Sequence, residues 1–170
     1  MTDPDHVDDI ITAWRVELPE IAGLPLELAK RSALLTSAFD VAGAAALEKL
    51  GLTQAEYGVL AVLRRVGEPF RVKPTELTHA LLLSSGGTSN VIKRLVAVGH
   101  IVREAAEDDG RSSWVRLTPQ GVTVAETAVR TVTAAHARLV DRIPESEAQR
   151  LSELLRTVLA AVEEGVLVRR

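Results

Sequence analysis

The order of secondary-structure signals between residues 74 and 117 constrains this fold more than any other feature. Two short helical patterns lie on either side of a Ser/Gly-rich turn, and two runs of strand-forming residues lie on either side of a second turn. The helical patterns occupy 74–82 and 88–99, and the turn between them lies at 84–87. The strand patterns occupy 101–103 and 113–117, and their turn lies at 108–110. Helix, turn, helix and a two-stranded wing predict a winged helix-turn-helix.

Composition agrees with a mainly helical fold. The chain has 170 residues, of which 46% are hydrophobic and only 3% aromatic. Abundant Ala and Leu favour helices, since these residues lose little side-chain entropy there, whereas aromatic residues favour strands. The length suits one domain with its own core. We therefore expect a single, mainly α domain over residues 1–170.

Amphipathic helices are predicted on both sides of the winged region. Thr53 and Glu56 form a capping box that starts a helix over 54–66, and Thr118-Pro119 starts another. The helix that starts there covers 119–139, and further helical patterns cover 7–18, 25–50 and 145–166. We expect residues 1–52 and 119–170 to form a helical dimerisation region and residues 53–118 the winged region, because the terminal apolar stripes need partners. An intramolecular bundle is the alternative.

Charge is unevenly distributed. The net charge is −3, yet residues 71–118 hold seven Lys/Arg against five Asp/Glu, a balance of +2 that leaves −5 for the rest. Such a segment can face a polyanion, although a solvated surface would also explain it. The acidic N-terminus has no apolar signal region, and no run of about 18 apolar residues occurs. We expect a cytoplasmic protein that does not cross a membrane.

Signals for catalysis, cofactors or metals are weak. The chain has no cysteine, which excludes disulfides and thiol chemistry. The four histidines show no metal-ligand spacing, Gly86-Gly87 lacks the context of a phosphate-binding loop, and no Ser/His/Asp set is recognisable. We expect no enzyme, no metal and no cofactor.

Four stretches carry a resemblance to a known family. The segments "LTQAEYGVLAVLRRVG", "LTHALLLSSGGTSNVIKRLVAVGHIVRE", "DDGR" and "VRLTPQG" resemble the MarR family of winged-helix transcriptional regulators. The resemblance is specific over roughly residues 53–121. It implies a homodimer that binds double-stranded DNA at a pseudo-palindromic operator, represses genes and releases DNA on binding a small molecule. The extra N-terminal helix with Trp14 resembles the branch with urate- and antibiotic-responsive members. The urate-responsive members carry an aspartate where this chain has Gly58 and an arginine where it has Val91. This chain lacks both side chains, so we expect weak urate binding at most.

In this fold the second helix of the pair enters the major groove and the wing approaches the minor groove. The DNA-contact candidates are the small polar and cationic residues of the second helix, together with Arg111 at the wing tip, whose guanidinium suits the negative minor groove. They are Ser84, Ser85, Thr88, Ser89, Asn90, Lys93, Arg94 and Arg111. Capping is an equal alternative for Ser84, and an ordinary surface turn is the alternative for Arg111.

A regulatory ligand is a further hypothesis. Trp14, Tyr57, Arg64 and Arg103 offer aromatic faces and positive charge, which suit a small aromatic anion bound between the dimerisation helices and the winged region. The alternatives are that Trp14 only anchors the first helix and that Arg103 pairs with an acid such as Glu104. A winged-helix module that dimerises and binds protein without binding DNA is the alternative function.

Overall fold

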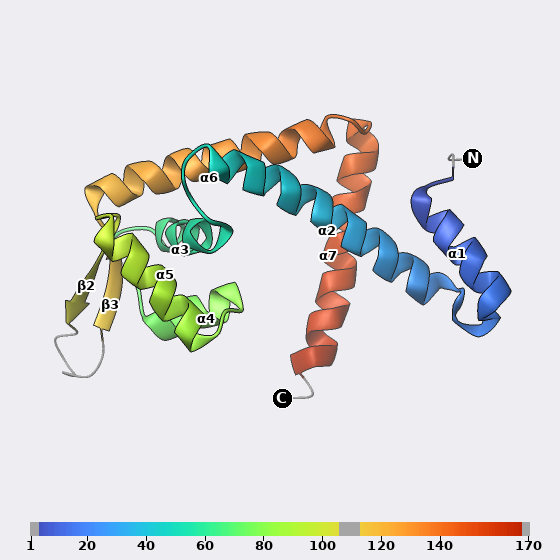
Figure 1. The fold of residues 1–170 in the computed structure, drawn as a ribbon, viewed down its shortest axis with the longest axis horizontal. Coiled ribbons are helices and arrows are strands. Elements are labelled where there is room, and N and C mark those ends of the chain that lie inside the picture. The colour runs from blue at the N-terminus through green and yellow to red at the C-terminus, as the bar shows by residue number, and fades with distance from the viewer. Residues whose placement is uncertain (1–3, 106–112, 168–170) are drawn as a thin grey trace.

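The N-terminal part is a short helix followed by a long one. The computed structural model describes residues 4–105 and 113–167 (Figure 1). Helix α1 spans His6–Glu17, a short 3-10 turn covers Pro19–Ile21, and α2 spans Leu24–Glu48. The Arg31 guanidinium on α2 forms ion pairs with Asp5 at 2.8 Å and Asp8 at 2.7 Å. Together with buried Val7 and Ile11, these pairs fix α1 against α2.

The predicted winged helix-turn-helix is confirmed. Its helices are α3 (Gln54–Arg65), α4 (Pro74–Leu81) and α5 (Ser85–Ala97), and its strands are β1 (Arg71–Val72), β2 (Ile101–Ala105) and β3 (Ser113–Leu117). One detail differs from the expected two-stranded wing. The sheet order is β1-β3-β2, with Arg71 opposite Arg116 and Arg103 opposite Val115, so the short β1 adds a third antiparallel strand.

Local capping explains where these helices begin. The Thr53 N–H donates to the Glu56 carboxylate at 2.8 Å, and the Glu56 N–H donates to the Thr53 hydroxyl at 3.2 Å, as the capping box predicts. At the start of α6 (Pro119–Val140), the Gly121 N–H donates to the Thr118 hydroxyl at 3.0 Å. Gly51, with φ +66°, ends the turn after α2 in the left-handed conformation expected of a C-terminal cap.

The hydrophobic core lies inside the winged region and beneath α6 (Pro119–Val140). Its fully buried members come from every element there, and the largest are Leu60, Leu63, Leu77, Ile92, Leu95, Ile101 and Leu117. The same core continues along the α2–α6 contact through Leu47 and Val132. Burial at about 25 cal/mol per Å² of apolar area makes this core the main source of stability. It therefore provides a rigid base for α5 and the wing.

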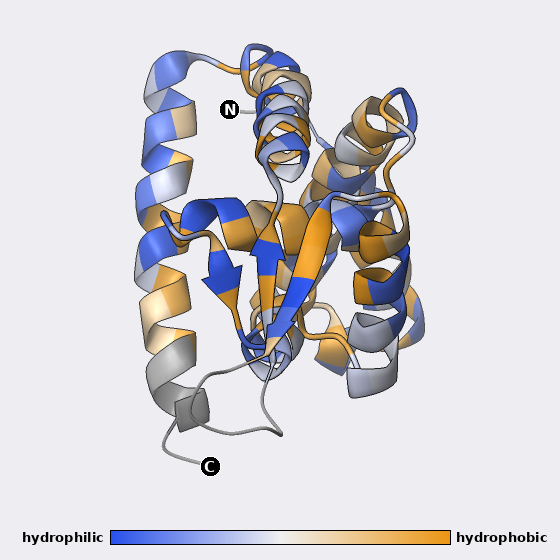
Figure 2. Ribbon diagram, turned by 90° about the vertical axis from the view of Figure 1, so that its left-hand side faces the viewer, coloured by the Kyte–Doolittle hydropathy of each residue, from blue (hydrophilic) through white to orange (hydrophobic). Residues whose placement is uncertain are grey.

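The last helix is different, because it has almost no cover. Helix α7 spans Glu145–Leu167, and every residue from 149 to 162 is exposed. Figure 2 shows hydrophilic and hydrophobic patches alternating along it. Its exposed apolar residues are Leu151, Leu154, Leu155, Val158, Leu159 and Val162. Helix α2 adds further exposed residues, of which Leu24 is 65% and Leu28 58% exposed.

Candidate nucleic-acid interface

Helices α4 and α5 are joined by a three-residue turn. Leu82 adopts the left-handed conformation at φ 52° and is 93% exposed. Ser84 caps α5, since its hydroxyl accepts a hydrogen bond from the Gly87 N–H at 3.1 Å. Helix α5 therefore starts at Ser85, and both glycines of the Ser/Gly-rich segment lie in its first turn. The capping interpretation of Ser84 is confirmed, and its DNA contact stays a prediction.

Thr88 corrects one of the predicted contacts. Its side chain is only 1% exposed, and its hydroxyl lies 3.1 Å from both the Ser84 carbonyl oxygen and the Thr78 hydroxyl. Thr88 therefore joins α5 to α4. A side chain buried in this way has no surface to offer a duplex, so its assignment as a DNA contact is wrong.

The remaining polar residues of α5 share its outer face. Ser85, Asn90, Lys93 and Arg94 are exposed and Ser89 is half-buried, whereas Val91, Ile92 and Leu95 point into the core. Such a helix presents hydrogen-bonding groups and positive charge along one side. Whether these residues contact DNA stays a prediction.

Arg94 has a partner on α3. Its guanidinium lies 3.4 Å from the Glu56 carboxylate and remains 58% exposed. Burial acts to raise the pKa of Glu56, but hydrogen bonds from the Thr53 backbone and hydroxyl, with the Arg94 charge, hold it below its ordinary value. The Glu56 carboxylate is thus ionised near neutral pH and helps to orient Arg94.

Strands β2 and β3 form the base of the wing. Arg116 forms an ion pair with Glu104 at 2.6 Å. Glu104 on β2 is therefore paired with Arg116 on β3, and the alternative that Arg103 pairs with Glu104 is wrong. Arg111 and the Asp108-Asp109-Gly110 turn lie outside the described residues, so the role of Arg111 stays a prediction.

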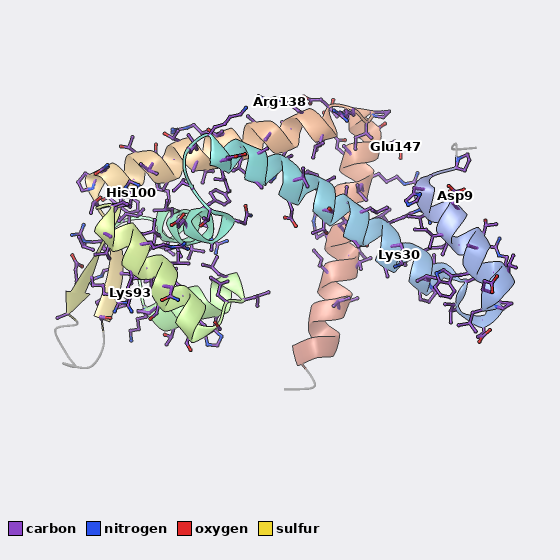
Figure 3. All side chains as sticks on the ribbon, viewed as in Figure 1. Asp9, Lys30, Lys93, His100, Arg138 and Glu147 are labelled. Atoms are coloured by element: carbon purple, nitrogen blue, oxygen red, sulfur yellow. The ribbon has the colours of Figure 1, made fainter. Side chains whose placement is uncertain are left out.

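A groove between α5 and β2 brings together two residues that the sequence assigned to different roles. Lys93, Val96, Val102 and Arg103 line a cavity of about 490 Å³. Lys93 was predicted to bind DNA and Arg103 to bind an effector, yet both face the same space. Figure 3 labels Lys93 on α5 beside the strands. No sequence pattern predicts that Lys93 and Arg103 lie on the same groove, because this depends on the angle between α5 and β2.

A second cationic cluster, absent from the sequence-based candidates, lies on the outer face of the sheet. The Arg71 guanidinium lies 4.9 Å and the Lys73 ammonium 5.5 Å from the centre of the Trp114 ring. Both distances allow cation–π attraction. The alternation of residues in the strands gives the signal, since Val115 and Leu117 are buried and Trp114 must face the other way.

The four predicted effector residues do not meet within one chain. Trp14 lies on α1, at the opposite end of the molecule from α3 and β2 (Figure 1). Arg64 on α3 donates hydrogen bonds of 3.0 and 2.8 Å to Glu126 and lies 5.0 Å over the Phe70 ring. Tyr57 is half-buried, and burial raises the pKa of its phenol. The effector itself stays a prediction.

Metal and membrane signals are also absent from the part of the chain that the structure describes. Within residues 4–105 and 113–167, no three His, Asp or Glu side chains gather as metal ligands would. None of the described helices combines the length and apolar character that a bilayer span requires.

The fold and its outer face define a winged helix-turn-helix protein, and comparisons with known proteins agree. The MarR family model matches residues 50–112. The transcriptional regulator PecS of Dickeya dadantii is 28% identical over 154 residues, which cover 88% of this chain and 90% of PecS. The chain is therefore similar to the MarR family over its winged region and to PecS over most of its length.

Solved structures of MarR from E. coli also resemble this fold. A mutant of MarR from E. coli superposes with a TM-score of 0.70 at 26% identity, over 78% of this chain and 96% of that one. The same mutant in complex with operator DNA gives a TM-score of 0.68 at 24% identity, over 86% and 97%. Because its identity is below 25%, the similarity to the operator complex supports the fold alone.

Proposed function

We propose that the protein is a homodimeric transcriptional regulator, of the repressor type, that binds double-stranded DNA by placing α5 in the major groove. The observation that carries this proposal is the outer face of α5, where Asn90, Lys93 and Arg94 are exposed beside the wing. Amide side chains suit adenine edges, and Lys or Arg suits guanine edges or phosphate. Double-stranded DNA as the target also implies a cytoplasmic protein.

The first turn of α5 supports close approach to the DNA backbone. Helix N-termini attract phosphates through free N–H groups and the helix dipole. Nothing lies within 4 Å of where a Cβ on Gly86 would be, and Ser85 beside it is exposed. The chain can therefore bring backbone N–H groups to a phosphate without a side chain between them.

The unpartnered apolar surface supports a homodimer. Exposed leucines and valines line α7, and a groove of about 650 Å³ between α2, α6 and α7 is lined by Leu35, Phe39, Leu151, Leu155 and Leu159 among others. Monomers seldom expose so much contiguous apolar area. A second copy related by a two-fold axis would cover both chains equally.

The dimer has a direct test in α7. The double substitution Leu155→Glu with Leu159→Glu should halve the molar mass measured by light scattering, because two charges would be buried in the interface. Gln149→Glu, an exposed position at the start of the same helix, should leave the mass at the dimer value. A dimer that survives the double substitution would refute this interface.

Regulation by a small aromatic anion is the finer part of the proposal. Tyr57 and Arg64 lie on α3, which packs against α6, so a ligand there would contact both a DNA-binding helix and a long terminal helix. We retain these two residues as candidates and leave out Trp14, which lies far from them in the same chain. Weaker binding of aromatic carboxylates to Arg64→Ala than to the unsubstituted protein, by calorimetry, would support this assignment, and equal binding would contradict it.

DNA binding is tested by selecting bound fragments from a pool of random double-stranded DNA. We expect enrichment of an imperfect palindrome with half-sites about 10 bp apart. Affinity for the enriched fragment should fall steeply as salt rises, since phosphate contacts release counterions. If nothing is enriched and no duplex shows salt-dependent binding, the chain is instead a dimerising module that binds protein.

A further inference from the structure

We propose that the groove between α5 and β2 binds the sugar-phosphate strand that separates the major groove from the neighbouring minor groove, with Lys93 and Arg103 contacting its phosphate. This inference rests on the proposed function and extends it. It assigns Arg103, on a wing strand, as a DNA contact rather than as part of an effector pocket.

The position of the groove follows from how a winged helix engages a duplex. When a recognition helix occupies the major groove and the wing reaches the adjacent minor groove, one DNA strand must pass between them. In this protein, α5 and β2 are the two elements on either side of that path, and they pack against each other (Figure 1). The cavity of about 490 Å³ lies at their junction.

The lining of the groove matches a phosphate and its sugar. Lys93 and Arg103 are both exposed and supply positive charge from two different elements. Val96, 39% exposed, and half-buried Val102 supply apolar contact that suits the carbon atoms of a deoxyribose. An anion with an apolar side is the chemistry that this combination recognises.

Among the described residues, the carboxylates nearest in the fold are directed to other cations. Glu104 follows Arg103 in the chain but pairs with Arg116 at 2.6 Å. Glu56 is directed to Arg94 at 3.4 Å. In the described ranges, neither Lys93 nor Arg103 has a carboxylate within ion-pair distance. Within this described part, no carboxylate competes with an external anion for the two charges.

A contact of this kind has a defined energetic signature. Phosphate contacts carry no base information, so losing one weakens binding to every sequence by the same factor. Each lost contact also lowers the salt slope, the change of log Kobs with log salt, by about 0.9. A dimer loses two contacts per substitution, which gives a decrease of about two. An effector ligand would give neither effect.

The experiment uses the full chain and a fluorescein-labelled 24-bp duplex of arbitrary sequence, titrated by fluorescence anisotropy at several salt concentrations. Arg103→Ala should lower the salt slope by about two, and Lys93→Ala should do the same. Arg138→Ala is the charge-matched control, because Arg138 is exposed on α6, far from α5 and β2 (Figure 3). It should leave the slope unchanged. Circular dichroism melting of each variant checks that it is folded.

Three outcomes would overturn the inference in distinguishable ways. If the unsubstituted protein binds with a steep slope and Arg103→Ala keeps that slope, the groove does not hold a phosphate while the proposed function stands. If Arg138→Ala lowers the slope as much as Arg103→Ala, the effect is one of net charge and the groove is not a site. If the unsubstituted protein binds no duplex at any salt concentration, the proposed function fails and the inference fails with it.

Discussion

At the scale of single residues, the Thr88 hydroxyl links the two helices of the helix-turn-helix by a hydrogen bond. It donates to the carbonyl oxygen of Ser84, the N-cap of α5, and accepts from the Thr78 hydroxyl on α4, both at 3.1 Å. We expect Thr88→Val, which keeps the shape and removes the hydroxyl, to lower the free energy of unfolding by about 1 kcal/mol. Urea unfolding measures this difference. Ser85→Ala, at an exposed neighbouring position, is the control and should change stability much less; equal losses would contradict the assignment.

Among the described glycines, Gly121 has the least room for a side chain. A Cβ there would overlap the His100 carbonyl oxygen, so α6 and the start of β2 would have to separate. We expect Gly121→Ala to cost about 3 kcal/mol or more, since main chain cannot yield as a flexible side chain can. Gly86→Ala is the matched control in α5, where the added methyl meets nothing and should stabilise by about 0.5–1 kcal/mol. Thermal unfolding of both variants gives the comparison, and similar Tm values would refute the close contact.

Residue spacing explains which of these roles were predictable. Thr88 stands three, four and seven residues before Val91, Ile92 and Leu95, which places it on their buried stripe. The Gly121 approach and the Lys93–Arg103 groove depend on distances between separate elements, and no local pattern encodes those distances.

At the scale of elements, α3 begins at a cap whose strength depends on pH. Folding lowers the pKa of Glu56 below its ordinary value of 4.5, so the ionised carboxylate stabilises the folded state. This contribution is complete above pH 4.5 and is lost as the pH falls through the folded-state pKa. The free energy of unfolding of Glu56→Gln should therefore be lower than that of the unsubstituted protein at pH 7. This difference should disappear as the pH falls below 4.5.

Urea unfolding of both proteins between pH 7 and pH 3 measures this difference. Glu48→Gln replaces an exposed carboxylate on α2 and should give a small difference throughout. A difference for Glu56→Gln that stays constant down to pH 3 would show that the charge of Glu56 does not stabilise the cap.

Most element boundaries were predictable, since they depend on local chemistry. The Thr53–Glu56 box and the Thr118-Pro119 start are both where the sequence placed them. The brief alternation over residues 70–73 predicts the third strand, and β1 confirms it, but its place in the sheet was not predictable. Arg71 and Val72 alternate too briefly to specify a partner, and only the tertiary fold pairs them with β3.

At the scale of the whole molecule, the polar surface and the exposed apolar surface lie on different elements. The winged region has a closed core and presents polar and cationic residues, whereas α2 and α7 expose leucines and valines. Packing these apolar faces across a two-fold axis would set two copies of α5 at a fixed separation. That separation is what converts two weak contacts with DNA into one specific complex.

Hydroxyl-radical footprinting of the fragment selected from random DNA tests this central claim most directly. We predict two protected patches of equal strength, related by two-fold symmetry and centred about 10 bp apart, as two recognition helices on one face of the duplex require. The Leu155→Glu with Leu159→Glu protein should lose both patches together at the concentration that protects the unsubstituted complex. A single patch, or unbroken cleavage along the whole fragment, would contradict a dimer that reads DNA through paired α5 helices.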